Sequence, residues 1–163
     1  MSFVAGKYAV TYDGDSLGQI EQGITLEHQF FGQVITGDCL AEGAQDMVFR
    51  GTSVFAQMTL LEWDAEASAS ALWPWGASYL DQNVVVGNLA SARWKSLVMT
   101  ALTDTPAATK GPSTITLHST LLAENYPVSV LFAPALRTVP LRFRVFPKGE
   151  GVSSGTALYG TTT

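Results

Sequence analysis

The fold is decided by TSVFAQMTLLEWDAEASASALWP, the stretch from Thr52 to Pro74. In its first half, every second residue is apolar: Val54, Ala56, Met58 and Leu60. Side chains alternate between the two faces of a strand, so this period of two predicts a half-buried β-strand.

The second half of the stretch predicts one short helix, from Asp64 to Trp73. Asp64 can accept hydrogen bonds from the free backbone amides of a first helical turn, and Glu66 suits the positive end of the helix dipole. Pro74 cannot continue the helical hydrogen-bond ladder. We therefore expect a mainly β protein, an antiparallel sandwich or half-barrel with one flanking α-helix and a long loop.

Alternating or apolar runs elsewhere predict the remaining strands. Tyr8 to Tyr12 alternates and ends at Asp13-Gly14, a pair suited to a tight hairpin turn. Short turns make antiparallel pairing of consecutive strands the simplest arrangement. Further strands are expected at Leu17–Ile20, Ile24–Phe30, Val84–Val86, Ser96–Thr103, Thr114–Leu122, Val128–Phe132 and Val139–Phe146, the last with Pro140 at an edge, an end or a bulge.

Between Gly32 and Gly51 the sequence shows no sustained period. It therefore reads as a long loop or an extended hairpin. Ordered connections of this length are usually functional. We expect this segment to be the arm that binds a partner.

Composition indicates a single domain over residues 1–163, with residues 150–163 as a flexible C-terminal tail. Apolar residues make up 47% of the chain and charged residues only 14%. A composition this poor in charge is typical either of turn-rich β proteins or of surfaces that are hidden in an assembly. The net charge of −5 argues against tight binding of nucleic acid. Residues 1–10 lack the basic region followed by a long apolar core that marks a signal peptide, and no apolar run is long enough to span a membrane, so we expect a soluble chain that is not exported through a signal peptide.

The sequence offers little catalytic chemistry. Gly151–Gly155 matches the G-x-S-x-G string around Ser153, but that motif needs a later base, and both histidines lie upstream. A flexible tail is the favoured interpretation. We therefore expect no enzyme activity.

We also expect no metal and no cofactor. His28 and His118 lack ligands at a recognised spacing, and Asp13 and Asp15 lack the remaining oxygen ligands of a calcium loop. Cys39 is the only cysteine, which excludes an internal disulfide and suits a reducing cytoplasm.

Two sets of side chains are candidates for binding. For the four tryptophans, packing in the core or at an interface is the favoured role, and a platform that stacks against sugars is the alternative. The four tryptophans are Trp63, Trp73, Trp75 and Trp94. Two arginines, Arg142 and Arg144, lie on one face of their predicted strand. They can either be solvated or form ion pairs with acidic residues of a neighbouring subunit. The candidates for inter-subunit contacts are Asp38, Glu42, Asp46, Arg50, Arg142 and Arg144.

The order of these segments resembles the tail tube proteins of tailed bacteriophages. The resemblance covers roughly Gly6 to Pro147. It rests on KYAVTYDGDSLGQIEQGITLEHQF, the long loop, SVFAQMTLLEWDAEASASALW and RTVPLRFRVFP. It is a likeness of arrangement rather than of one invariant motif.

The resemblance implies a structural virion protein, a homohexameric ring that stacks into a tube for ejected DNA. The implied partners are further copies of the chain, other phage tail proteins and passing double-stranded DNA that is not tightly bound. It implies no membrane partner and a place in the virion tail after assembly in the host cytoplasm. A tail terminator, a tube subunit of an injection machine and a β-sandwich carbohydrate-binding or adhesin module remain alternatives.

Overall fold

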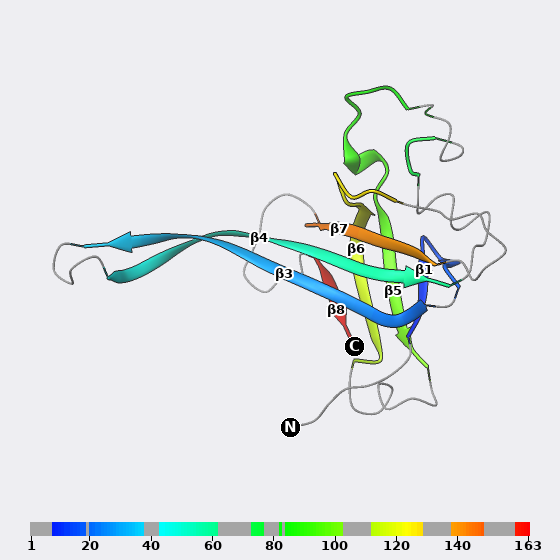
Figure 1. The fold of residues 1–163 in the computed structure, drawn as a ribbon, viewed down its shortest axis with the longest axis horizontal. Coiled ribbons are helices and arrows are strands. Elements are labelled where there is room, and N and C mark those ends of the chain that lie inside the picture. The colour runs from blue at the N-terminus through cyan, green and yellow to red at the C-terminus, as the bar shows by residue number, and fades with distance from the viewer. Residues whose placement is uncertain are drawn as a thin grey trace.

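The computed structural model describes residues 8–18, 20–37, 43–61, 73–76, 82, 84–102, 112–128, 138–148 and 159–163. These residues form one antiparallel sheet of eight strands (Figure 1). Its strands are β1 (Tyr8–Tyr12), β2 (Asp15–Ser16), β3 (Ile20–Thr36), β4 (Ala44–Leu60), β5 (Lys95–Ala101), β6 (Thr114–Leu122), β7 (Val139–Phe146) and β8 (Gly160–Thr162). The predicted mainly β, antiparallel class is confirmed.

The strand order is β2-β1-β5-β6-β7-β4-β3, with β8 added beside β6. Within the described ranges, the only helix is a single 3-10 turn, η2, at Ala90–Ala92. The predicted helix Asp64–Trp73 lies outside the described residues except for Trp73.

One face of the sheet forms the core. On β7, Val139, Leu141, Phe143 and Val145 are buried while the residues between them are partly exposed, as the alternation predicts. Ala56, Met58 and Leu60 of β4 join the same cluster, together with Val10, Leu97 and Met99.

The sheet curls, so that its first strand packs against its seventh. The rings of Tyr12 on β1 and Phe143 on β7 lie 5.3 Å apart, although β5 and β6 separate these strands in the sheet. The Tyr12 hydroxyl donates a hydrogen bond to the Thr120 carbonyl at 3.3 Å. Burial, helped by the Asp13 carboxylate, raises the pKa of Tyr12 far above its usual value, so the phenol stays neutral.

The first hairpin has the predicted turn. Asp13 and Gly14 adopt φ of 56° and 93°, and Tyr12 pairs with Asp15 across them. Positive φ at both central residues is the geometry that a two-residue hairpin needs. Lys95 fixes the turn from outside with a 2.7 Å ion pair to Asp13.

After the first hairpin the strands do not pair in chain order, so the expected sequential meander is wrong there. β1 pairs with β5 on its other side, and β3 pairs with β4 along the full length of both strands. Leu17 and Gly18 are not in a strand, and β3 begins only at Ile20. Strand pairing depends on contacts between residues distant in sequence, which local patterns do not contain.

Three further expectations change. Val84–Val86 is part of a loop and not a strand. The segment from Gly32 to Gly51 is the end of an extended hairpin in its described residues, so that alternative is confirmed there and the long-loop alternative is wrong. The C-terminal residues from Tyr159 are docked, because β8 pairs with β6, while residues 149–158 lie outside the described residues.

The predicted position of Pro140 is confirmed. Pro140 faces Thr59 of β4, while pairing of β7 with β6 begins only at Phe143. The proline therefore occupies the end of β7 that has a partner on one side only, where a missing N–H costs no ladder bond.

We predict that Phe143→Ala lowers the free energy of unfolding by about 3–5 kcal/mol, since it empties a fully buried site beside Tyr12. Urea denaturation measures this. The control Val48→Ala changes a half-exposed side chain and should shift stability by no more than about 0.5 kcal/mol. Equal losses in both variants would contradict the assigned core.

Candidate interaction site on a projecting arm

The most distinctive feature is the outer half of the β3–β4 hairpin, which projects away from the sheet (Figure 1). β7 supports β4 only over Val54–Leu60. Beyond this support, residues 30–36 of β3 and 44–52 of β4 pair only with each other. We call these two segments the arm. At about 3.3 Å per residue, the arm reaches roughly 25 Å past the supported sheet.

One face of the arm continues the core face outward. The pairing of Phe30 with Thr52 and of Gly32 with Phe49 places alternate residues on the side of Ala56 and Met58. We call the exposed apolar residues on this side the apolar stripe. They are Leu26, Phe30, Val34, Met47 and Phe49, exposed by 43 to 64%.

Gly32 allows the stripe to pack closely. A Cβ atom at this position would lie 2.5 Å from the sulfur of Met47, which must cross here from the paired strand. A β-bulge lies in the same place, because Phe31 pairs with Gly51 while Gly32 pairs with Phe49. Bulges bend and twist a hairpin, and this one lies inside the arm, close to where the arm leaves the supported sheet.

The opposite face of the arm is also rich in apolar residues. Phe31, Ile35 and Val48 are 45 to 51% exposed there. Between them, Arg50 donates a 3.0 Å hydrogen bond to the Gln33 side chain. Large apolar side chains on both faces are typical of strands that are covered on both sides.

A polar cluster fixes the root of the arm. The two oxygens of the Glu27 carboxylate on β3 accept hydrogen bonds from Gln57 on β4 and from Arg142 on β7, both at 2.7 Å. One carboxylate thus joins three neighbouring strands where the arm leaves the sheet. Charged hydrogen bonds of this kind are stronger and more directional than neutral ones.

The two arginines of β7 share one aromatic ring. The guanidinium carbons of Arg142 and Arg144 lie 4.1 and 4.9 Å from the centroid of Phe55. Arg144 also forms an ion pair with Glu124. The Nε atoms of both arginines are buried without a hydrogen-bond partner, so stacking on the ring is what packs these guanidinium groups.

The C-terminal segment anchors the arm from the other side. The Tyr159 hydroxyl donates to the Thr52 carbonyl at 3.0 Å and accepts from the Thr52 hydroxyl at 2.9 Å. β8 follows immediately and pairs with β6. Thr52 is the last paired residue of the arm, so this contact fixes its starting point.

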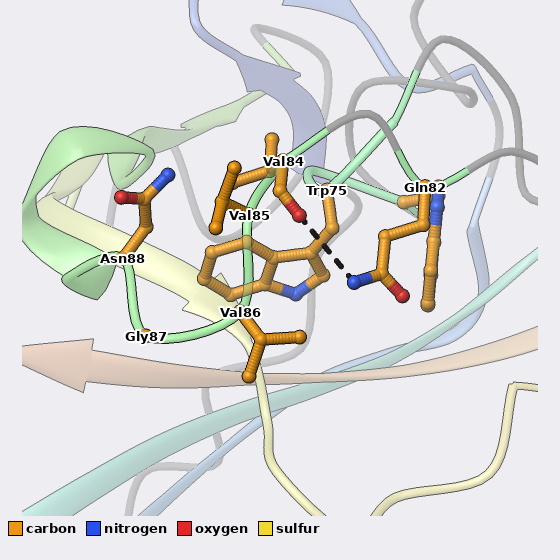
Figure 2. A pocket seen from close by; sticks show the side chains of 8 residues that line it. Trp75, Gln82, Val84, Val85, Val86, Gly87 and Asn88 are labelled. Carbon is orange, nitrogen blue, oxygen red and sulfur yellow. Dashed lines mark hydrogen bonds between the residues drawn. The ribbon is translucent and has the colours of Figure 1, made fainter.

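A second exposed surface surrounds two tryptophans. The Val84 amide donates to the Trp75 carbonyl at 3.1 Å, and the loop that follows curves around the Trp75 indole (Figure 2). Its turn closes with a 3.3 Å bond from the Asn88 amide to the Val85 carbonyl, and Gly87 supplies the positive φ of 99°. We call the resulting cavity of about 250 Å³ the tryptophan pocket. Its lining residues are Trp73, Trp75, Gln82, Val84, Val85, Val86, Gly87 and Asn88.

The predicted contact residues fall into three groups. Asp38 and Glu42 lie outside the described residues. Asp46 and Arg50 are exposed on the arm, and the Asp46 carboxylate accepts a hydrogen bond from the Met47 amide. Arg142 and Arg144 pair with Glu27 and Glu124 of the same chain, so they do not depend on a neighbour for an acidic partner.

The other candidate residues are dispersed. His28 is exposed on β3 and His118 is partly buried on β6. Trp94 packs against Phe146, with ring centroids 5.5 Å apart. Cys39, Trp63 and Ser153 lie outside the described residues.

Sequence reasoning missed the apolar stripe, Glu27 and the tryptophan pocket. The apolar faces of the arm have a signal in the sequence, because a solvated loop does not need the large apolar side chains Phe30, Phe31, Val34 and Ile35. Glu27 had none, since Arg142 lies far away along the chain. The pocket is lined by residues within 73–88, and the apolar run Val84–Val86 reads as a strand, which hides the turn that forms it.

We predict that Glu27→Gln lowers the free energy of unfolding by about 0.5–1 kcal/mol, because one neutral amide cannot accept from both Gln57 and Arg142. The matched control is Glu124→Gln, which changes a more exposed partner of an arginine on the same strand and should cost only a few tenths of a kcal/mol. Urea denaturation of both variants provides the comparison, and a larger loss in Glu124→Gln would refute the role given to Glu27.

Comparison of the sequence with protein-family models and with curated proteins finds no match. Within the described part of the chain, no helix is long and apolar enough to cross a membrane. The same residues contain no group of three or more His, Cys, Asp or Glu side chains placed to hold a metal ion.

Proposed function

We propose that this chain is a structural subunit of a phage tail tube, which forms hexameric rings that stack around a lumen for ejected DNA. The observation that carries the proposal is the arm with apolar side chains on both faces. Strands of this kind are normally buried between two layers. Because the arm projects past the sheet, neighbouring copies of the chain are the surfaces that can cover it.

The edges of the sheet support self-assembly. The strand order begins at β2 and ends at β3, so the outer side of the 17-residue β3 has no partner strand within the described sheet. A long, apolar strand edge is an aggregation hazard for a monomer. The same edge can add the backbone of another chain, which is how a subunit extends a sheet across an interface.

The charges suit a wall that DNA passes without tight binding. Glu27 and Glu124 neutralise Arg142 and Arg144, and the net charge of the chain is −5. Tight binding requires many unpaired cations that displace counterions from phosphates. The proposal includes other phage tail proteins as partners, no membrane partner, no enzyme activity, and a place in the virion tail after assembly in the host cytoplasm.

Two related structural roles differ from the proposed one in their partners but not in the surface that they use. A tail terminator or a tube subunit of an injection machine would use the same arm. A carbohydrate-binding or adhesin module is the candidate from another functional class, and it is favoured by the presence of both Trp73 and Trp75 at one pocket. A module of that kind would stay monomeric, and glycans would change its tryptophan emission.

We predict that the purified chain forms rings or tubes and that the double variant Phe30→Thr/Phe49→Thr remains monomeric. The variant removes the two aromatic side chains of the apolar stripe, exposed by 57 and 64%, and keeps strand-forming residues in their place. Each lost aromatic contact is worth roughly 1.5–3 kcal/mol, so the concentration needed for assembly should rise by at least about 100-fold. Electron microscopy and sedimentation velocity measure this.

The matched control is Gln29→Thr, which changes an exposed polar side chain of β3 just before the arm and removes no large apolar surface. It should assemble as the unchanged chain does. Normal assembly of the phenylalanine variant would clear the arm of this role. A wild-type chain that stays monomeric at high concentration and does not enter isolated tails would refute the tail tube proposal itself.

A further inference from the structure

The exposed apolar surface of the described residues is concentrated in two places. Apart from Leu102, every large apolar side chain exposed by 40% or more belongs to the arm and its root or to the loop over the tryptophan pocket. In that loop, Val85, Val86 and Leu89 are exposed by 77, 87 and 75%. Exposed apolar patches of this kind mark interaction sites.

The two surfaces differ in shape. The arm is a thin, projecting hairpin, whereas the loop bends around Trp75 and borders a cavity (Figures 1 and 2). At about 250 Å³, this cavity is smaller than the roughly 300–1,000 Å³ that drug-sized ligands occupy. It therefore suits one or two side chains of a protein rather than a free cofactor.

The lining of the pocket also suits a strand as its occupant. Two indoles and three valines line it with apolar groups, and Gln82 and Asn88 add side-chain amides. The Gln82 amide nitrogen donates a 3.4 Å hydrogen bond to the Val84 carbonyl (Figure 2), so its oxygen and the Asn88 amide are the groups proposed to meet a partner. An amide group can pair with the free N–H and C=O groups of an unpaired strand edge. The outer side of β3 presents such groups along the arm, beside the aromatic side chains of the stripe.

The arm and the pocket lie apart in the molecule. The arm extends away from the sheet on one side, while the segment from Val84 to Ala92 lies beyond β6 and β7 (Figure 1). The arm therefore does not cover the pocket of its own chain. Two different, complementary patches on one molecule join copies head to tail, which produces rings or filaments rather than closed pairs.

The area involved is sufficient for a specific contact. Full burial of an aromatic side chain removes roughly 150–250 Å² from water. With two phenylalanines, three aliphatic side chains of the stripe and the facing loop, docking buries on the order of 1,000 Å² in total, which is the lower limit for a stable interface.

We propose that the apolar stripe of one copy docks into the tryptophan pocket of the next copy. This inference rests on the proposed self-assembly and names the surface that receives the arm. It assigns Phe30 and Phe49 as the inserted side chains and Val85, Val86 and Trp75 as the surface that they contact.

The test uses two variants of the full chain. The arm variant is Phe30→Thr/Phe49→Thr, and the pocket variant is Val86→Asp, which places a charge on a side chain that is 87% exposed and so leaves the fold intact. Each variant alone should stay monomeric. When the two variants are mixed, the intact arm of the pocket variant should dock into the intact pocket of the arm variant and form a one-to-one dimer. The dimer should grow no further, because its second arm and its second pocket are the altered ones.

Sedimentation velocity of the mixture gives the readout. The tryptophan emission of the chain should also shift to shorter wavelength, because docking removes water from the Trp75 indole. The matched control is Asn125→Asp, which adds the same charge in an exposed turn where φ is 58°. Asp tolerates this conformation as Asn does, so this variant should assemble normally.

Other outcomes overturn the inference in distinguishable ways. If the wild-type chain assembles and Val86→Asp assembles equally well, the pocket is not the receiving surface and the tube proposal stands. If the mixture of variants stays monomeric, the contact is not between arm and pocket. If maltose or N-acetylglucosamine at millimolar concentration shifts the tryptophan emission of the monomeric arm variant, the pocket binds carbohydrate instead.

Discussion

The apolar face of the β3–β4 hairpin is the constraint on which the rest of the structure depends. At the root of the hairpin, this face supplies Ala56 and Met58 to the core and is covered by the curled sheet. The same alternation continues outward to Phe30 and Phe49, where no other strand of the described sheet covers it. Burial of apolar surface drives both folding and association. The outer part of the hairpin therefore exposes an apolar face that the strands of the described sheet leave uncovered.

The contacts at the root make this arm a defined element. Glu27 joins β3, β4 and β7 through two 2.7 Å hydrogen bonds, and Tyr159 holds Thr52 with both atoms of its hydroxyl. An interface element fixed before binding loses less conformational freedom when it docks. The structure thus places its directional polar bonds near the start of the arm and its exposed apolar side chains along the arm.

Local patterns in the sequence predict the strands well where only one face is apolar. Val139–Phe146 alternates cleanly, and Asp13-Gly14 supplies a turn that only a few residue pairs allow. The segment from Gly32 to Gly51 reads poorly because both of its faces carry apolar residues, which hides the period of two. Val84–Val86 resembles a strand in composition, yet its neighbours place it in a turn over Trp75. Strand pairing and the contacts of Glu27 depend on residues distant in sequence, whereas the tryptophan pocket forms locally within residues 73–88.

Amide hydrogen exchange of the wild-type chain, measured by mass spectrometry below and above the concentration at which particles form, tests the covered arm most directly. We expect residues 30–36 and 44–52 to exchange at least about tenfold more slowly in the assembled state, while β5 to β7 change little because they are already protected. Particles that form while exchange in the arm stays the same would contradict the assignment of the arm as the interface.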